Sequence, residues 1–204
     1  MKQTKHILLT AALLLSSLVA SGQSITNLSQ LNGETLYYFS LPNHASGNTS
    51  WVVQASDQRT IQASKQQGIT PDGSDPRQQF ALVTFDDGYT YYLYHPAEGM
   101  YVNMDGSLGT SPVNAIYFKE GEYDGTFIAY FDNSHHINVD GYGIISINNW
   151  STPDGGNSCS IQAVGFFNPA MIPVRYIAQL ESTQLYHVFQ PYRNTAWAVD
   201  EGGT

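Results

Sequence analysis

The feature that most restricts the fold of this chain is an internal repeat of three similar segments. The segments are LYYFSLP at residues 36–42, TYYLYHP at 90–96 and TFIAYFD at 126–132, and each ends in a turn former. Segments so rich in aromatic residues are typical of extended strands. Self-similarity along a chain indicates that one structural unit is used several times. We therefore expect three related β units between residues 25 and 167.

A second predicted strand follows each of these segments, at residues 50–53, 101–104 and 136–139. Because side chains alternate between the two faces of a strand, every second residue should share a buried face. The residues expected on that face are Trp51, Val53, Val102, Met104, Ile137 and Val139. A later strand completes each unit, at residues 79–83, 114–118 and 158–161. A polar insert at 64–77 lengthens the first unit.

The spacing of these strands defines the fold class. Strands about every 8–12 residues, separated by Gly, Pro, Asn and Asp, indicate an all-β barrel or sandwich. Residues 25–167 show no convincing amphipathic helical periodicity. Three units of about 40 residues favour a β-trefoil with three pseudo-repeats, which is a repeat architecture. A β-sandwich predicts no threefold repeat and stays the alternative.

The N-terminal segment differs from the repeats. Lys2 and Lys5 precede an apolar run from Ile7 to Ala20, and small residues follow, as in a secretory signal peptide. The run is too short to cross about 30 Å of hydrocarbon comfortably. Residues 1–22 are therefore predicted to be a signal peptide. The protein is expected to be exported to the periplasm, cell surface or extracellular space, without membrane insertion.

The C-terminal segment also departs from the three units. Asn168-Pro169 and Pro173 mark a break, so residues 168–183 are predicted to be a linker. Residues 184–204 have the pattern of the first two strands of another repeat, which the chain does not complete. We expect the chain to be a fragment of a longer polypeptide with further domains downstream.

Charge and cysteine content narrow the possible partners and the source. The chain has 8 Lys and Arg against 17 Asp and Glu, and two of the lysines lie in the leader. Nucleic-acid recognition needs clustered cations, so we expect no nucleic acid as a partner. Cys159 is the only cysteine. An exported protein without an internal disulfide is more typical of bacteria than of eukaryotic secretion.

With the three units aligned, residues 25–167 resemble the ricin B-type β-trefoil lectins, and still more the trefoil modules of exported glycan-processing proteins of gut bacteria. The most specific stretch is INNWSTPDGGN at 147–157. Sugar sites of that family combine an acidic residue, an aromatic residue and an Asn-Gln pair before a buried Trp. The third unit has Asn138, Trp150 and Asn157 at these positions, with Asn in place of the acid. Its Ser158 and Cys159 replace the Gln and the Trp.

Sugar chemistry makes the same stretch a candidate site. A sugar presents a face of C–H groups and a rim of hydroxyls, so binding needs an aromatic platform beside amides or carboxylates. Trp150 can supply the platform, and the following loop carries Asp154 and Asn157. The predicted carbohydrate-binding residues are Trp150, Asn138, Asp154 and Asn157. In the alternative interpretation, Trp150 packs on the barrel and Asp154-Gly155 only forms a turn.

Other chemistry has less support. His135 and His136 are adjacent on a strand and point to opposite faces, without a set of metal ligands around them. The carboxylates of residues 120–124 are expected to form a solvated acidic turn, and Cys159 to be an inert buried thiol. The sequence contains no Gly-x-Ser-x-Gly, His-Glu-x-x-His or phosphate-loop motif, so we expect no catalytic residue, no metal and no cofactor.

The sequence therefore favours a non-catalytic carbohydrate-binding module with a neutral glycan as its partner. The alternative is a structural or protein-binding accessory domain of a larger secreted enzyme. In either case, any catalysis would belong to downstream domains.

Overall fold

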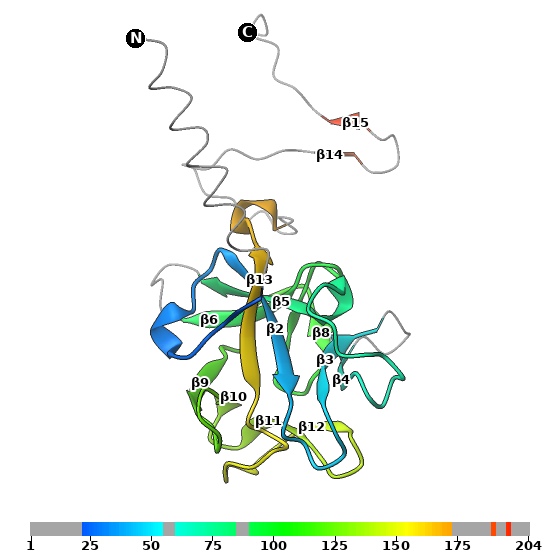
Figure 1. Ribbon diagram of the computed structural model, residues 1–204. Helices are drawn as coiled ribbons and strands as arrows, with labels where there is room; N and C mark the ends of the chain where they lie inside the picture. Colours follow the sequence, from blue (N-terminus) through cyan, green and yellow to red (C-terminus); the bar gives the residue numbers. More distant parts are fainter. Residues whose placement is uncertain (1–21, 55–59, 85–89, 173–188, 191–194, 197–204) are drawn as a thin grey trace, which may run out of the picture. The chain divides into compact units, whose positions relative to one another are not determined.

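The computed structural model describes residues 22–54, 60–84, 90–172, 189–190 and 195–196 (Figure 1). Across these ranges the chain forms strands and three short 3-10 helices, and no α-helix occurs in them. The all-β class is therefore confirmed. Within the same ranges no helix has the length and apolarity to cross a membrane. The chain divides between Ile172 and Pro173 into two units.

Twelve strands of the first unit follow one another in three groups of four. The first group is β2 (Thr35–Leu41), β3 (Thr49–Val53), β4 (Ile61–Ala63) and β5 (Gln79–Thr84). The second is β6 (Tyr91–His95), β7 (Met100–Val102), β8 (Leu108–Gly109) and β9 (Tyr117–Glu120). The third is β10 (Phe127–Asp132), β11 (His135–Val139), β12 (Ile145–Asn148) and β13 (Ser160–Phe166).

The remaining short elements lie around these groups. They are β1 (Gln23–Ser24), which pairs with β13, and the 3-10 helices η1 (Leu28–Gln30), η2 (Pro76–Gln78) and η3 (Pro169–Met171). Side chains before the 3-10 helices cap them: Asn27, Asp75 and Asn168 each accept a hydrogen bond from a backbone N–H of the first turn.

The first and last strands of the three groups are joined in a closed ring. Ladders connect β2 with β5, β5 with β6, β9 with β10, and β13 with β2. Isolated bridges complete the ring between β6 and the start of β9, and between β10 and the start of β13. The second and third strands of each group pair as hairpins, β3 with β4, β7 with β8 and β11 with β12.

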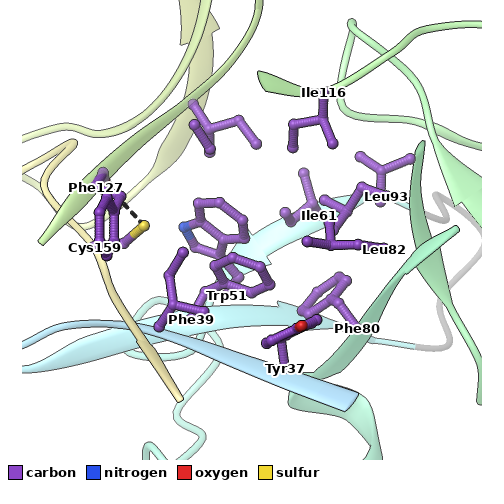
Figure 2. Packing of buried hydrophobic residues seen from close by; sticks show 14 of the residues in the cluster. Tyr37, Phe39, Trp51, Ile61, Phe80, Leu82, Leu93, Ile116, Phe127 and Cys159 are labelled. Carbon is purple, nitrogen blue, oxygen red and sulfur yellow. Dashed lines mark hydrogen bonds between the residues drawn. The ribbon is translucent and has the colours of Figure 1, made fainter. Parts of the chain in front are cut away.

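In each group, a residue near the start of the first strand pairs with a residue in, or just before, the last strand. We call this position, which is the same in all three repeats, the crossing. The paired residues at this crossing are Tyr37 with Phe80, Tyr91 with Ile116, and Phe127 with Cys159. The last residues of the three pairs, Phe80, Ile116 and Cys159, are at most 1% exposed. Cys159 thus fills a structural position, and its Sγ donates to Phe127 O over 2.9 Å (Figure 2).

A stack of aromatic rings fills the interior of the ring (Figure 2). Phe39 stacks on Trp51 with ring centroids 4.3 Å apart, and Phe80 meets both edge-on. Burying each such side chain contributes roughly 1.5–3 kcal/mol. Of the six residues predicted on the buried face, five are 1–2% exposed: Trp51, Val53, Val102, Ile137 and Val139. Met104 is only partly buried and packs against the same cluster.

In the second unit, two short strands are described, β14 (Phe189–Gln190) and β15 (Thr195–Ala196). They pair antiparallel, Phe189 with Ala196 and Gln190 with Thr195. Residues 1–21 and most of 173–204 lie outside the described residues. The predictions of a signal peptide, of a linker and of an incomplete repeat containing Trp197 therefore stay predictions.

Candidate functional site

The loop that follows β12, residues 149–158, is held in shape by two of its own side chains. Asp154 Oδ1 accepts hydrogen bonds from the backbone N–H of Gly156 (2.8 Å) and of Asn157 (3.1 Å). Asn157 Oδ1 accepts from the backbone N–H of Asp154 (3.0 Å), and its Nδ2 donates to Thr152 O (2.8 Å). Because all these hydrogen bonds join residues within the loop, the loop has a defined conformation without regular secondary structure.

Close backbone contact ties this loop to the neighbouring strand β11. The N–H of Val139 donates to Gly156 O over 2.8 Å. A Cβ added at Gly156 would lie 2.5 Å from Val139 O and 2.7 Å from Asn138 Oδ1. At Gly155 an added Cβ would meet the backbone oxygen of Asn43. The two glycines are therefore needed for close approach, as well as for the turn that the sequence indicated.

Trp150 is presented to solvent by this loop and is held by two hydrogen bonds, one to its ring and one to its backbone. Its side chain is 50% exposed. The indole Nε1 donates to Asp154 Oδ2 over 2.9 Å, and its backbone N–H donates to Asn148 Oδ1, also over 2.9 Å. The indole is thus half exposed and half buried, with a carboxylate at its edge.

Three of the four residues predicted as a sugar site, Asn138, Asp154 and Asn157, adjoin Gly156, and Trp150 bonds to Asp154. The four differ in accessibility. Asp154 is partly exposed beside the indole. Asn138 borders Gly156, and its Oδ1 is buried without a hydrogen-bond partner. Asn157 is 1% exposed, and both ends of its amide are used inside the loop. The structure thus gives Asn157 a loop-holding position.

The same amide position recurs in the other two groups and was not recognised in the sequence. Gln78, Asn114 and Asn157 each stand two residues before the last residue of their crossing pair. Gln78 Nε2 donates to Thr70 O over 2.9 Å, and its Oε1 accepts from Ser50 Oγ. Asn114 Oδ1 accepts from the backbone N–H of Met104 over 3.1 Å. An amide two residues before Phe80, Ile116 and Cys159 was the available signal.

Lys119 on β9 also reaches this loop, and sequence reasoning did not place it there. Its Nζ lies 3.4 Å from Ser151 O, next to Trp150, and 3.4 Å from His136 Nε2. Burial lowers the pKa of His136, and the charge of Lys119 lowers it further. The imidazole is therefore neutral at pH 7 and accepts a hydrogen bond from the ammonium group.

The remaining candidate residues in the part of the chain that the structure describes are His135 and Cys159. Three or more His, Cys, Asp or Glu side chains do not gather there as metal ligands. The His135 side chain pairs with Asp132 over 2.7 Å at the surface. Burial raises the pKa of Cys159 to about 12, which leaves its thiol protonated.

Comparison with known proteins gives a distant likeness in structure only. No protein-family model matches the chain, and no curated protein matches it. A similar solved structure is that of a Polyporus squamosus lectin bound to a human-type influenza-binding epitope, Neu5Aca2-6Galb1-4GlcNAc. The identity is 12%, the TM-score 0.45, and the match covers 65% of this chain and 49% of the lectin chain. The chain thus spans about half the length of that lectin, and the likeness is one of β fold alone.

Proposed function

We propose that residues 25–167 form a β-trefoil of the ricin B type and serve as a non-catalytic carbohydrate-binding module of an exported bacterial protein. The closed ring of first and last strands supports the trefoil. The three hairpins and the three equivalent crossing pairs also support the trefoil, because a β-sandwich does not predict a pairing that recurs in three repeats.

The observation that carries the binding function is the exposed, immobilised indole of Trp150. A large aromatic side chain that is half exposed gives up much of the free energy that burial would provide. Solvent-exposed loops on a rigid scaffold are where binding residues concentrate. Because the ring is already oriented by its hydrogen bond to Asp154, little rotamer freedom is lost when a ligand stacks on it. The ring suits the C–H face of a sugar.

The residues around the indole determine what kind of sugar fits. Asp154 can accept hydrogen bonds from sugar hydroxyls beside the platform, whereas the Oδ1 of Asn138 is buried next to Gly156. Asn157 keeps the loop in shape and does not face the ligand. A carboxylate at the site and a chain net charge of −9 disfavour anionic sugars. The ligand class that fits best is a neutral glycan.

A structural or protein-binding accessory role is the second candidate. It is favoured by Tyr142 at the tip of the β11–β12 hairpin, which is 89% exposed. An aromatic side chain at such a tip suits an anchor for a protein partner. Tyr142 lies at the opposite end of β12 from Trp150, so the two functions can be separated by substitution.

The test is a screen of the full chain on an array of neutral glycans, with the Trp150→Ala and Tyr142→Ala variants beside it. Losing one stacked aromatic costs about 1.4 kcal/mol or more, a tenfold weaker affinity. We expect binding to be lost in Trp150→Ala and kept in Tyr142→Ala, with both variants folded by thermal melting. Equal binding by wild type and Trp150→Ala would place the site elsewhere. Wild type that binds no glycan would favour the accessory role.

A further inference from the structure

The four-stranded sheet of β9 to β12 carries a row of ring-bearing side chains on one face. Tyr130 pairs with Tyr117 on one side and with His136 on the other, and His136 pairs with Asn148. Residues directly opposite one another in antiparallel strands share a face. The other face contributes to the core with Phe118, Ala129, Ile137 and Ile147. The row therefore lies on the outward face of the sheet.

The rings of this row are in contact with one another. Tyr117 and Tyr130 have centroids 5.7 Å apart, and Tyr130 stacks on His136 at 5.4 Å. The Nζ of Lys119 lies 5.6 Å from the centre of the Tyr130 ring. Tyr117 is 47% exposed, whereas His136 is 2% exposed. The β9 end of the row is thus open to solvent, and the β11 end is covered.

Lys119 connects this open end with the loop that holds Trp150. An ammonium group has three N–H donors. The contacts with His136 Nε2 and Ser151 O use two of them, which leaves one for a ligand oxygen. Lys119 also shares a face of β9 with Tyr117, two residues earlier in the strand. Lys119 is therefore an anchored cation that shares a strand face with the half-exposed Tyr117 and bonds to Ser151, the residue after the half-exposed Trp150.

We propose that Tyr117, Tyr130 and Lys119 form a second sugar subsite that adjoins Trp150, so that the ligand is a neutral oligosaccharide of two or more linked units. This inference rests on the proposed function of Trp150. Tyr117 offers a second aromatic platform with a phenol hydroxyl, and Lys119 donates to a hydroxyl or ring oxygen. Asp154 accepts hydrogen bonds at the other platform. The two subsites are complementary, one providing a donor and the other an acceptor.

The test is isothermal titration of the full chain with neutral sugars of increasing length. The probes are mono-, di- and tetrasaccharides of glucose, galactose, mannose and N-acetylglucosamine. For the sugar that binds, we expect at least a tenfold gain in affinity from the monosaccharide to the tetrasaccharide. Tyr117→Thr, which keeps a residue suited to a strand, should remove this gain and leave the monosaccharide affinity within twofold. Tyr117→Trp, which restores a platform, should keep the gain, as should Tyr142→Ala.

The outcomes separate the inference from the function on which it rests. Affinity that does not rise with length, or a Tyr117→Thr variant that keeps the full gain, would overturn the second subsite and leave Trp150 as a single-sugar site. Loss of monosaccharide binding in Trp150→Ala together with loss of only the length-dependent gain in Tyr117→Thr would support both. If no probe binds wild type, both proposals fail.

Discussion

Replacing Gly156 with alanine should destabilise the domain and release the loop that carries Trp150. The new Cβ would lie 2.5 Å from Val139 O, whereas ordinary contacts begin at 3.4 Å. The obstructing atom is a backbone oxygen of β11, which cannot rotate away as a side chain can. The loop must therefore move by about 0.9 Å, the difference between these two distances.

The size of the effect follows from what this movement breaks. The 2.8 Å hydrogen bond from Val139 N–H to Gly156 O is lost or weakened, at a cost of about 0.5–1.5 kcal/mol. Crowding in a packed site adds about 1–3 kcal/mol. The total is about 1.5–4.5 kcal/mol, which corresponds to a fall in Tm of roughly 3–18 °C for a domain of this size.

Thermal unfolding followed by circular dichroism measures this change, with Gly141→Ala as the matched control. A Cβ at Gly141 meets no heavy atom within 4 Å, so its substitution should change the stability by no more than about 0.5 kcal/mol. The Gly156→Ala variant should also lose glycan binding, since the indole depends on the loop. Equal Tm values for the two variants would refute the reasoning about backbone contact.

Two further predictions concern buried titratable groups. Because burial raises the pKa of Cys159 to about 12, the thiol should not react with Ellman's reagent at mildly alkaline pH until guanidinium unfolds the protein; rapid reaction in the native state would contradict this. His95 is fully buried against Phe80, and burial lowers its pKa. The unfolded chain therefore binds a proton from about pH 6.5 downward while the native state does not, so the free energy of unfolding should be level above this pH and fall below it. His95→Gln should reduce that slope in urea titrations at several pH values, and an unchanged slope would show that other groups produce it.

The strands that the sequence predicts well are those whose side chains identify them locally. The segments at 36–42, 90–96 and 126–132 match β2, β6 and β10 to within one residue at each end. The third strands of the groups were not located, because β8 has two residues and β4 has three, too few for an alternating pattern. These short strands are recognised in the structure by their pairing with β3 and β7.

Burial on both faces of β3 shows a second limit of prediction from the sequence. Alternation places Val52 away from the core face, yet it is 0% exposed. Gln78, at the end of η2, bonds to Ser50 on that same outward face of the strand. The polar insert thus covers a surface that alternation alone would assign to solvent. Nothing local in the sequence states where an insert will pack.

For the candidate site, the sequence identified the loop but not the role of each residue in it. Trp150 and Asp154 were recognisable because an aromatic residue and a carboxylate in a Gly-rich loop have a clear chemical use. Asn157 looks the same in sequence whether it faces a ligand or closes the loop, and only its bonds to Thr152 and Asp154 decide. Tyr117 and Lys119 belong to another repeat, and cross-strand pairing brings them to the loop.

The pairing of β2 with β13 closes the ring, and it also determines when this domain can fold. Ser40 of β2 pairs with Ser160. One edge of this early strand therefore pairs with a strand about 120 residues later in the chain. Contacts so distant in sequence slow folding, and an open strand edge invites wrong pairing in the meantime. The same closure places Gln23 beside Ala163. A circular permutant that links the residues after β13 to Gln23 and opens at the Gly141 turn would keep every strand pair of the ring.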